Sequence, residues 1–437
     1  MGPRSWQMLT RRFARTARQD GLTSALGKAG RYLVRRMRGH GSSALARAPE
    51  VPPNTGAHYL SSVWQDLAQH NAFHIHAAPA TLQRRRQIAL IGDLNLPQCR
   101  KYRVEQLAHF WQGRGVEFTY AHYEDIPRAA SIMQQATHLF EYRLKCTDVT
   151  QMLRYEARRL RLPILYDLDD PLFSVSAYAT YGNMNAVDPA LKSHFVNEAP
   201  KYLDMMNGAD ALSVSTPGMI AHAALYSPRP VYLRRNFADG QTLDQGANAM
   251  NAEQIEDGRF RVAFASGSQG HEADLEEIIK ELSTFVLADP ERRLMVMGHV
   301  DPKALPGELN GQIERYRFSD YGQYLATLAQ ADCAVMPLGE DAFNGCKSAV
   351  RVLDAAAVGV PSVVGTVGDL AAVVRHGETG LIAQKPSDWG GALEMLANAR
   401  SQTRQMGLAA RKDVETRWSG HAEPHIIAPE LIRWVEG

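Results

Sequence analysis

Residues 343–366, FNGCKSAVRVLDAAAVGVPSVVGT, decide the fold, because a helix pattern leads at once into a strand pattern. Apolar residues recur at helical spacing and predict a short buried helix, which Gly359 and Pro361 end. The apolar run SVV after it predicts a buried strand. The apolar positions of the helix are Val350, Leu353, Ala357 and Val358. A helix that leads into a buried strand is typical of α/β proteins.

Three polar residues of the same stretch are spaced to share one helix face. Lys347, Arg351 and Asp354 lie four and then three residues apart, so their side chains are predicted to project together. Two cations and a hydroxyl-accepting carboxylate on one face suit a nucleoside diphosphate. An ordinary surface helix with a salt bridge is the alternative, since such pairs are common and weak.

Length and composition predict a globular protein with two domains of ordinary size. The chain has 437 residues, is 45% hydrophobic and carries a net charge of +1, which argues against a chain-wide nucleic-acid binder. Its longest apolar runs are strand-sized and no secretory signal is visible, so no membrane-spanning helix is predicted. The four cysteines lack the paired spacing of a zinc site or disulfide framework, which fits a reducing cytosol.

Strand and helix patterns alternate along most of the chain and predict two parallel sheets. We expect a first domain at 87–237 and a second at 259–415, joined by a polar connector at 238–258 that lacks apolar periodicity. A basic arm and linker would occupy 1–86, and a C-terminal helix within 416–437 would return toward the first domain. Two doubly wound, Rossmann-like domains facing a central cleft would place a ligand at the carboxyl ends of their strands.

The first 40 residues form a basic arm. Ten Lys or Arg residues fall within positions 1–38, against the single acid Asp20, and apolar residues are interleaved with them. This pattern is typical of a helix lying on an anionic membrane surface. A helix docked on its own protein, a disordered tail and an organellar transit peptide are the alternatives.

A glycine-containing loop opens the second predicted domain. The stretch SGSQGHEADL lies between a predicted strand and a predicted helix, so Gly267 and Gly270 would let the backbone approach an anion at the helix start. A tight strand-to-helix turn is an equally weighted alternative. His271 is a candidate phosphate donor or catalytic contact, or only a helix-start residue.

Three carboxylates end a strand of the first predicted domain. In the run YDLDD, strand alternation points Asp167 and Asp169 to the same side, and Asp170 follows directly. Carboxylates this close repel one another unless a cation, an arginine or a hydroxyl substrate shares the site. The run therefore predicts a polar site at the cleft that binds acceptor hydroxyls or a metal. Helix capping by Asp170 ahead of Pro171 is the alternative.

Cations follow the first predicted strand in the run CRKYR. Arg100 and Arg103 stand at a predicted helix start, so we expect them to face the cleft and hold a phosphate of either substrate. The alternative is that these cations at the helix start form ion pairs with the acids of YDLDD and bind no phosphate.

These residues together resemble the GT-B fold glycosyltransferases, and specifically the retaining glycosyltransferase family 4. The resemblance is carried by RVAFASGSQGHEADL, KSAVRVLDAAAVGVPSVV, VGDLAAVVRHGETGLIA and the tryptophan in PSDW, and it covers most of 87–420. It implies a donor-ribose contact for Asp354, which matches the second acid of the family's two-glutamate motif. The first glutamate is replaced by Cys346. Family members with a lysine-serine signature are closer and imply that Lys347 and Ser348 meet the donor diphosphate.

The same resemblance assigns further positions. Gly267 and Gly270 match the family's glycine loop, which here lacks the usual Arg or Lys pair, so Lys347 and Arg351 are expected to supply that charge. Asn236 matches the hinge asparagine. Asp169 departs from the family pattern, because it stands where an active-site histidine is often found. The features CRKYRV and YDLDD resemble bacterial enzymes of surface-polysaccharide assembly, including rhamnosyltransferases.

The resemblance implies a bacterial glycosyltransferase at the cytoplasmic face of the membrane. It would move a hexosyl or deoxyhexosyl group from a nucleoside-diphosphate sugar to a lipid-linked glycan of O-antigen, capsule or similar type, with retention. No cofactor or metal is required for this, and the YDLDD acids are the only candidate metal ligands. Two alternatives are a non-catalytic nucleotide-sugar-binding or scaffold subunit and a sugar-nucleotide epimerase. Neither glycine loop fits the dinucleotide fingerprint of a Rossmann dehydrogenase.

Overall fold

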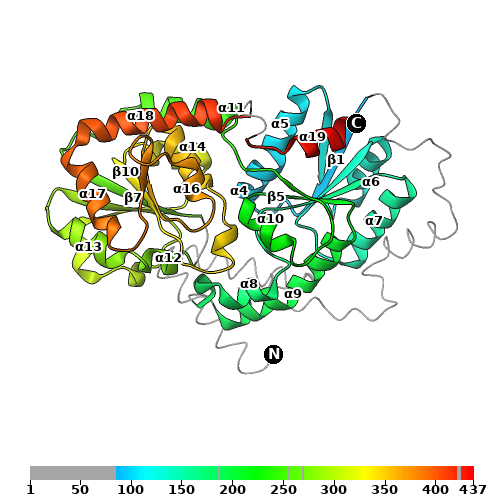
Figure 1. The fold of residues 1–437 in the computed structure, drawn as a ribbon, viewed down its shortest axis with the longest axis horizontal. Helices are drawn as coiled ribbons and strands as arrows, with labels where there is room; N and C mark the ends of the chain where they lie inside the picture. The colour runs from blue at the N-terminus through cyan, green and yellow to red at the C-terminus, as the bar shows by residue number, and fades with distance from the viewer. Residues whose placement is uncertain (1–84, 186–187, 254, 268–269, 421–424) are drawn as a thin grey trace, which may run out of the picture. The chain divides into compact units, whose positions relative to one another are not determined.

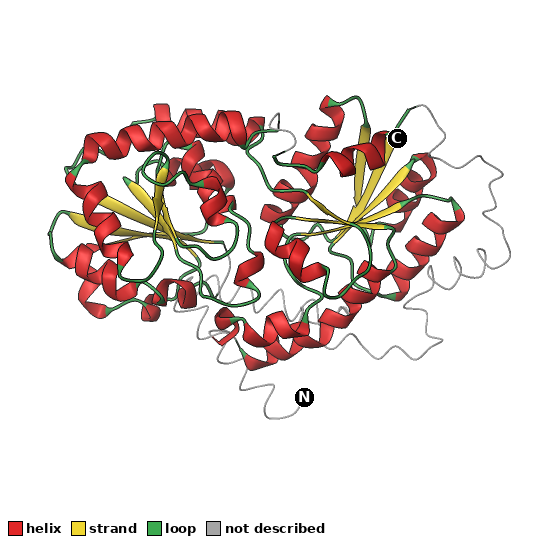
Figure 2. Cartoon of the chain, viewed as in Figure 1, coloured by secondary structure: helices red, strands yellow, loops and turns green. Residues whose placement is uncertain are grey.

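The computed structural model describes residues 85–185, 188–253, 255–267, 270–420 and 425–437. The predicted basic arm lies outside these residues. The described chain forms two domains, each with a parallel sheet between helices (Figures 1 and 2). This confirms the predicted α/β fold of two Rossmann-like domains.

The first sheet has six parallel strands in the order β2-β1-β3-β4-β5-β6. The direction of winding changes between β1 and β3, and ligands of doubly wound sheets bind at the carboxyl end of such a switch point. The strands are β1 Gln87–Gly92, β2 Glu117–His122, β3 His138–Tyr142, β4 Ile164–Leu168, β5 Ala211–Val214 and β6 Val231–Leu233.

Helices cover both faces of the first sheet. One face packs on α6, α7, α8, α9 and α10, and the other on α5 and on α19 from the far end of the chain. A π-helical turn, η3, interrupts the helix after β1. The elements are α4 Pro97–Arg100, η3 Lys101–Glu105, α5 Gln106–Gly113, α6 Ile126–Gln135, α7 Asp148–Arg159, α8 Val175–Thr180, η4 Gly182–Asn185, α9 Pro189–Asn207, α10 Pro217–Ala223 and α19 Pro429–Glu436.

The second sheet has six parallel strands in the order β12-β11-β10-β7-β8-β9, with its switch point between β7 and β10. Successive residues of β7 alternate between the two faces: Val262 packs in one core and Ala263 in the other. The strands are β7 Phe260–Ser266, β8 Arg292–Gly298, β9 Ile313–Tyr316, β10 Cys333–Met336, β11 Ser362–Val364 and β12 Gly380–Ile382.

The helices around the second sheet form two layers. Helices α12, α13 and α17 cover one face, and α11, α14, α15, α16 and α18 cover the other. They are α11 Gly240–Asn251, α12 Glu272–Glu276, α13 Ile279–Leu287, α14 Tyr321–Leu328, α15 Val350–Ala357, α16 Leu370–Val373, α17 Asp388–Asn398 and α18 Arg400–Arg417, with short turns η5 Pro302–Ala304, η6 Gly307–Gln312 and η7 Asn344–Cys346.

The segment around Lys347 differs from the sequence prediction. Helix α15 begins at Val350, and Lys347 precedes it in an extended conformation, so Lys347, Arg351 and Asp354 do not share one helix face. The carbonyl of Lys347 accepts a hydrogen bond from the backbone N–H of Asp369 at 3.0 Å, which ties this extended residue to a distant segment of the chain.

The predicted polar connector is also different in the structure, because most of it is helix α11. Its buried positions are Thr242, Gly246 and Ala249, which give no hydrophobic periodicity. A Cβ at Gly246 would lie 2.2 Å from the carbonyl oxygen of Ala357, so this glycine permits close packing of α11 on α15.

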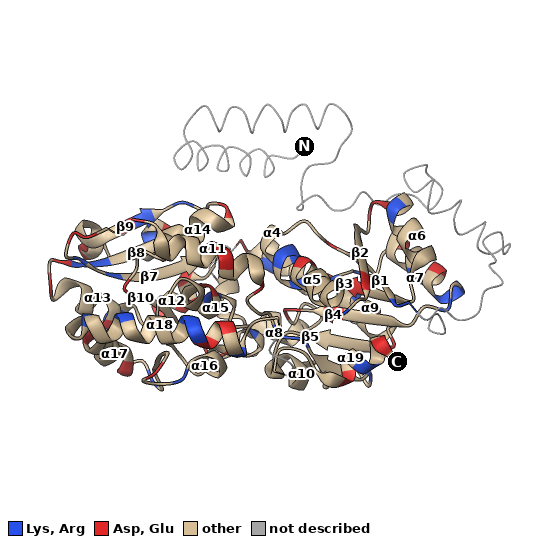
Figure 3. Ribbon diagram, turned by 90° about the horizontal axis from the view of Figure 1, so that it is seen from above, with Lys and Arg blue, Asp and Glu red and all other residues tan. Residues whose placement is uncertain are grey.

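Charges of both signs are interspersed over the two domains (Figure 3). Within the described residues, no helix is both long and apolar enough to cross a membrane.

Candidate functional site

The switch point of the second sheet brings Arg351 to the glycine loop. A guanidinium N–H of Arg351 donates to the carbonyl of Ala265, near the end of β7, at 3.1 Å. Gly270 has a φ of +98°, a conformation that favours glycine. Its N–H donates to the carboxylate of Glu272 at 2.9 Å. Residues 268 and 269 of this loop lie outside the described chain.

His271 lies beside this loop and caps no helix amide with its side chain. Its Nδ1 lies 2.7 Å from Oδ2 of Asp274 and 3.4 Å from Nδ2 of Asn183 in the first domain. Burial lowers the pKa of His271, and the charges of Arg351 and Lys347 lower it further against the opposing effect of Asp274. Two cations therefore lie near a histidine that is neutral at pH 7.

Lys347 joins the two domains by an ion pair. Its Nζ lies 3.1 Å from Oδ1 of Asp170, which follows β4 in the first domain. Burial alone would raise the pKa of Asp170, but Lys347 and Arg143 outweigh it and the pKa is lowered. Arg143 also pairs with Asp169 at 2.5 Å. The acids at the end of β4 are thus compensated by cations from both domains, and we call Arg143, Asp169, Asp170 and Lys347 the interdomain cluster.

Asp354 is buried beneath two phenol groups. The hydroxyl of Tyr102, from η3 of the first domain, donates to Oδ1 at 2.8 Å, and that of Tyr321 donates to the same atom at 2.7 Å. Burial raises the pKa of Asp354 to about 6, although these hydrogen bonds and Lys101 act to lower it. The carboxyl assigned to a ribose by resemblance therefore already accepts two hydroxyl groups in this structure.

Two predicted cleft residues lie elsewhere. Arg103 and Asp167 are fully buried and bond to each other within the first domain, with Nε of Arg103 2.9 Å from Oδ2 of Asp167. Asp167 therefore diverges from Asp169, because Asp169 lies beyond the end of β4 and strand alternation stops there. Arg100 pairs with Glu105 at 2.7 Å and remains half-exposed. For Arg103 the structure therefore agrees with the alternative, in which a cation of CRKYR pairs with an acid of YDLDD.

Other predicted residues lie at the contact between the domains. Nδ2 of Asn236 donates to Oγ of Ser348 at 3.0 Å. The carbonyl of Cys346 accepts from the hydroxyl of Thr216, at the start of α10, at 3.0 Å. The segment that contains Ser348 is therefore held from the first-domain side.

The sequence analysis missed Arg143 and Asn183 and did not single out Tyr102. Arg143 directly follows β3, the neighbour of β4, so a cation after one strand beside acids after the next was a usable signal. Tyr102 gave no such signal, because its partner Asp354 lies 252 residues further on.

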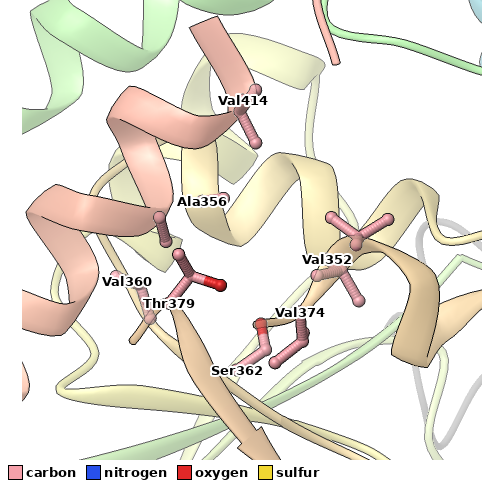
Figure 4. A pocket seen from close by; sticks show the side chains of 9 residues that line it. Val352, Ala356, Val360, Ser362, Val374, Thr379 and Val414 are labelled. Carbon is pink, nitrogen blue, oxygen red and sulfur yellow. The ribbon is translucent and has the colours of Figure 1, made fainter. Parts of the chain in front are cut away.

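Metal ligands do not gather at these acids. Among the described residues, no group of three His, Cys, Asp or Glu side chains is placed to hold a metal ion. One small crevice in the second domain, between α15, β11 and α18, is lined by Val352, Val360, Val374 and Val414 with Ser362 and Thr379 (Figure 4). Its volume of about 10 Å³ is that of a single water, so it holds no nucleotide.

Comparison with known proteins finds sequence similarity in the second domain. Residues 259–399 match the family model described as glycosyl transferases group 1. A curated relative, D-inositol 3-phosphate glycosyltransferase of Rhodococcus erythropolis (strain PR4 / NBRC 100887), is 38% identical over 87 residues, which are 20% of this chain and 19% of that protein. The match thus spans about a fifth of the relative.

Solved structures resemble the whole described chain. Sucrose-phosphate synthase from Thermosynechococcus elongatus has a TM-score of 0.51 at 15% identity, over 77% of this chain and 96% of that one. A glycosyltransferase from Rickettsia africae ESF-5 gives 0.52 at 9% identity, over 78% and 96%. WaaG, a glycosyltransferase involved in lipopolysaccharide biosynthesis, gives 0.50 at 12% identity, over 80% and 100%. Residues 259–399 therefore resemble the group 1 glycosyltransferases, and the described chain has the GT-B fold.

Proposed function

We propose that this protein is a glycosyltransferase that moves a sugar from a nucleoside-diphosphate donor to a glycan acceptor. The observation that carries the proposal is the position of Arg351 and Lys347. They lie near His271 at the switch point of the domain that matches the group 1 model. Doubly wound sheets bind phosphate esters at such points.

The chemistry needs stabilisation of the leaving group. As the bond between the sugar and the diphosphate breaks, negative charge grows on the phosphate oxygens, and fixed cations stabilise it most in the transition state. Lys347 is suited to this because the carboxylate of Asp170 keeps its pKa above the ordinary value despite burial. Arg351 and the amides around Gly267 and Gly270 would complete the diphosphate site, and Ser348 would contribute a hydroxyl.

Asp354 would bind the donor ribose. Two phenol O–H groups already donate to it, and ribose hydroxyl groups have the same donor chemistry. Donor binding in this position requires at least one of the two tyrosine hydroxyls to move away from the carboxylate.

On the acceptor side, the interdomain cluster offers Asp169 and Asp170. Both acids are partly exposed, with 13% and 21% of their side chains accessible. We propose that they bind acceptor hydroxyls and that His271 contacts the reacting groups. Half-exposed Arg100 is a further candidate for an acceptor phosphate.

Finer assignments rest on the sequence alone. The KSAVRVLD signature supports the retaining family 4, and CRKYRV with YDLDD supports bacterial surface-polysaccharide assembly with a rhamnosyltransferase-like substrate. The ten cations of positions 1–38 support peripheral binding to the cytoplasmic face of a membrane. No nucleic acid partner is proposed.

The test is a thermal-shift screen of the full chain against UDP, GDP, TDP and CMP and their common sugar derivatives. A bound nucleotide stabilises the folded state by mass action, by about 2.7 kcal/mol at a hundredfold excess over Kd. The stabilising nucleotide sugar is then assayed for transfer to lipid-linked glycans. Failure of every nucleotide to stabilise the protein would overturn the proposal.

A non-catalytic nucleotide-sugar-binding subunit is the second candidate. Two observations favour it. Cys346 stands where the resembling family has its first glutamate, and two tyrosine hydroxyls already donate hydrogen bonds to Asp354. Binding of a nucleotide sugar without hydrolysis or transfer, across the acceptor panel, would select it.

A further inference from the structure

The carboxylate of Asp274 holds the imidazole of His271 where helix α12 begins. Nδ1 of His271 lies 2.7 Å from Oδ2 of Asp274, and the side chain of Asp274 is 0% exposed. The other groups that bond to this carboxylate in the described chain are all donors. Nδ2 of Asn183 reaches Oδ2 at 2.9 Å, and the N–H of Gly339 and Nδ2 of Asn344 each reach Oδ1 at 3.2 Å. Both oxygens of Asp274 therefore accept from two groups each.

These bonds fix which nitrogen of His271 carries the proton. Burial would raise the pKa of Asp274, but hydrogen bonds and charges, those of His271 foremost, outweigh burial and lower it. An ionised carboxylate only accepts, so Nδ1 is the donor and the neutral ring carries its hydrogen there. Nδ2 of Asn183 lies 3.4 Å from Nδ1, but it donates its two hydrogens to Asp274 and to the hydroxyl of Tyr181.

The other ring nitrogen of His271, Nε2, is unprotonated in this tautomer. Among the described residues, none forms a hydrogen bond with Nε2, and 14% of the side chain is exposed. An unprotonated nitrogen accepts hydrogen bonds and cannot donate one to a phosphate oxygen. For His271 to bind a phosphate through Nε2, the ring must therefore gain a second proton.

The groups around the ring of His271 set the free energy of that protonation. Burial lowers the pKa of the ring, and the charges of Arg351 and Lys347 lower it further. Asn183 is uncharged, and burial raises the pKa of Tyr181, so both first-domain neighbours are neutral at pH 7. Asp274 opposes the two cations and favours the protonated ring. An anion that paired with the cations would shift this balance toward imidazolium.

We propose that Asp274 is a positioning residue that enables His271 to take up a proton when the diphosphate of the donor binds. This inference rests on the proposed function and concerns how pH regulates that same site. The phosphate oxygens would pair with Arg351 and Lys347 and cancel the charge that opposes a second proton. The N–H at Nε2 then donates to a phosphate oxygen, while the N–H at Nδ1 keeps its bond to Asp274. The proton comes from solvent and returns to it when the nucleoside diphosphate leaves.

Proton uptake makes donor affinity depend on pH. Where the free ring is neutral and the bound ring is charged, affinity falls by about tenfold for each unit of rising pH. Asp354 would act with the opposite sign, because its pKa is about 6 and its ionised form accepts hydrogen bonds from ribose hydroxyls better. Measurements above pH 7, where Asp354 is ionised, therefore isolate the effect of His271.

Isothermal titration calorimetry of the full chain measures the uptake. The probes are UDP-glucose, UDP-N-acetylglucosamine, GDP-mannose and TDP-rhamnose, whose esterified diphosphates do not titrate above pH 7. At pH 7.5, the heats in MOPS and in Tris differ by the buffers' heats of ionisation for each proton taken up. We expect about one proton for each donor bound. Binding without uptake would overturn this inference alone, whereas no binding of any probe or nucleotide would overturn the proposed function with it.

His271→Lys and His271→Gln separate charge from shape. The lysine is charged throughout, so its protein should bind the donor without proton uptake and equally well at pH 7 and 8. The glutamine is neutral, so its protein should bind about tenfold more weakly than the wild type at pH 7, again without uptake. Glu276→Gln, which removes an exposed carboxylate from the same helix, is the matched control and should keep the uptake. Proton uptake by His271→Gln would overturn the assignment to this ring.

Asp274→Asn tests the positioning role. Its amide N–H would face other donors and the ring would lose the charge that favours a second proton, so uptake at pH 7.5 should fall and affinity should drop about tenfold. Adding His271→Lys supplies a permanent cation, and the double variant should bind within about twofold of His271→Lys at pH 7 and 8. A double variant that binds as weakly as Asp274→Asn would show that Asp274 only supports the fold.

Circular dichroism spectra and melting temperatures establish that each variant is folded. If Asp274→Asn does not fold, the two histidine variants decide the proposal, because they leave Asp274 and its four hydrogen bonds in place. Equal uptake by the wild type, His271→Lys and His271→Gln would then overturn it.

Discussion

Two buried carboxyls near the contact between the domains, Asp167 of the first and Asp354 of the second, are compensated differently. Asp167 of the first domain is 0% exposed and bonds to the guanidinium of Arg103 and to Oγ of Ser213, the latter at 2.5 Å. Asp354 of the second domain is 3% exposed and is bonded by two phenols. Burial favours the neutral form of both, but only Asp167 has directly bonded arginine to outweigh it. Its pKa is lowered, whereas that of Asp354 is raised to about 6.

The difference separates a structural pair from groups that are available to a substrate. The N–H groups of Arg103 donate to acceptors within the first domain. These are Asp167, the carbonyl of Arg234 at 2.7 Å and Oδ1 of Asn236 at 3.1 Å. Lys347 is bonded to Asp170 and keeps 22% of its side chain exposed. A cation that is buried on all sides stabilises the fold, while one with an open side can also contact a ligand.

The largest loss of stability is expected for Arg103→Ala. It leaves the buried Asp167 charge without its main partner, which typically costs about 3–5 kcal/mol of the free energy of unfolding. Urea denaturation of the variant measures the loss. Arg158→Ala is the control, because Arg158 pairs with Asp210 at an exposed site and should lose less than about 1 kcal/mol. If both variants lost the same free energy of unfolding, the buried pair of Arg103 and Asp167 would stabilise the fold no more than the exposed pair of Arg158 and Asp210.

The next effect is on activity, in Lys347→Ala. Loss of a fixed cation at the leaving diphosphate should reduce kcat by ~10²–10³-fold, or about 3–4 kcal/mol of barrier. Asp170 keeps Arg143 as a second partner, so stability should fall by less than in Arg103→Ala. Lys347→Arg keeps the charge and should retain more activity. Transfer assays with the nucleotide sugar found by thermal shift decide this, and wild-type turnover in Lys347→Ala would exclude the proposed role.

The third effect is a pH dependence that belongs to Asp354. Its pKa is about 6 in the folded protein against an ordinary 3.8, so between these values the folded state holds a proton that the unfolded chain has lost. The stability contribution of this group is therefore present at pH 4 and falls by about 3 kcal/mol as the pH rises through 6. Asp354→Asn should abolish this fall.

Urea denaturation at pH 4, 5, 6 and 7 compares Asp354→Asn with the wild type and with the exposed control Glu308→Gln. The asparagine variant should be more destabilised relative to the wild type at pH 4 than at pH 7. A difference between the two proteins that does not change with pH would show that Asp354 is ionised throughout. In that case the phenols would compensate it as fully as Arg103 compensates Asp167.

The sequence predicted the sheets well because most strands are local apolar runs bounded by turn residues, as in QIALIG and RRLMVMG. It failed for α11, whose close packing depends on Gly246 rather than on large apolar side chains. It also failed at Lys347, which is extended and accepts a hydrogen bond from Asp369, 22 residues away.

Within the site, residue types were predictable and pairings were not. The sequence singled out Arg103, Asp167, Asp169 and Asp170, but it could not tell which acid each cation would reach. The pair of Arg103 and Asp167 spans 64 residues, and that of Lys347 and Asp170 spans 177. Such contacts depend on the order of the strands and on how the two domains meet, which no local pattern encodes.

The smallest expected effect concerns the close packing of α10 of the first domain on η7 of the second. Gly218 of α10 lies so close to η7 that an added Cβ would be 2.1 Å from the carbonyl oxygen of Gly345, two residues before Lys347. Gly218→Ala should therefore cost about 1–3 kcal/mol by overpacking. Gly113→Ala, with nothing within 4 Å of the new Cβ, should be neutral or stabilising by about 0.4–1 kcal/mol.

Urea denaturation measures both glycine variants, and a double variant of Gly218→Ala with Lys347→Ala tests their coupling. Because the strain is transmitted to the segment that carries Lys347, the two losses should not add, with an interaction of at least about 0.5 kcal/mol. Arg158→Ala, on the far helix α7, should add to Gly218→Ala within error. If Gly218→Ala is as stable as the wild type, α10 and η7 separate at little cost. The ion pair of Lys347 and Asp170 would then hold the domains together less than its position in the structure implies.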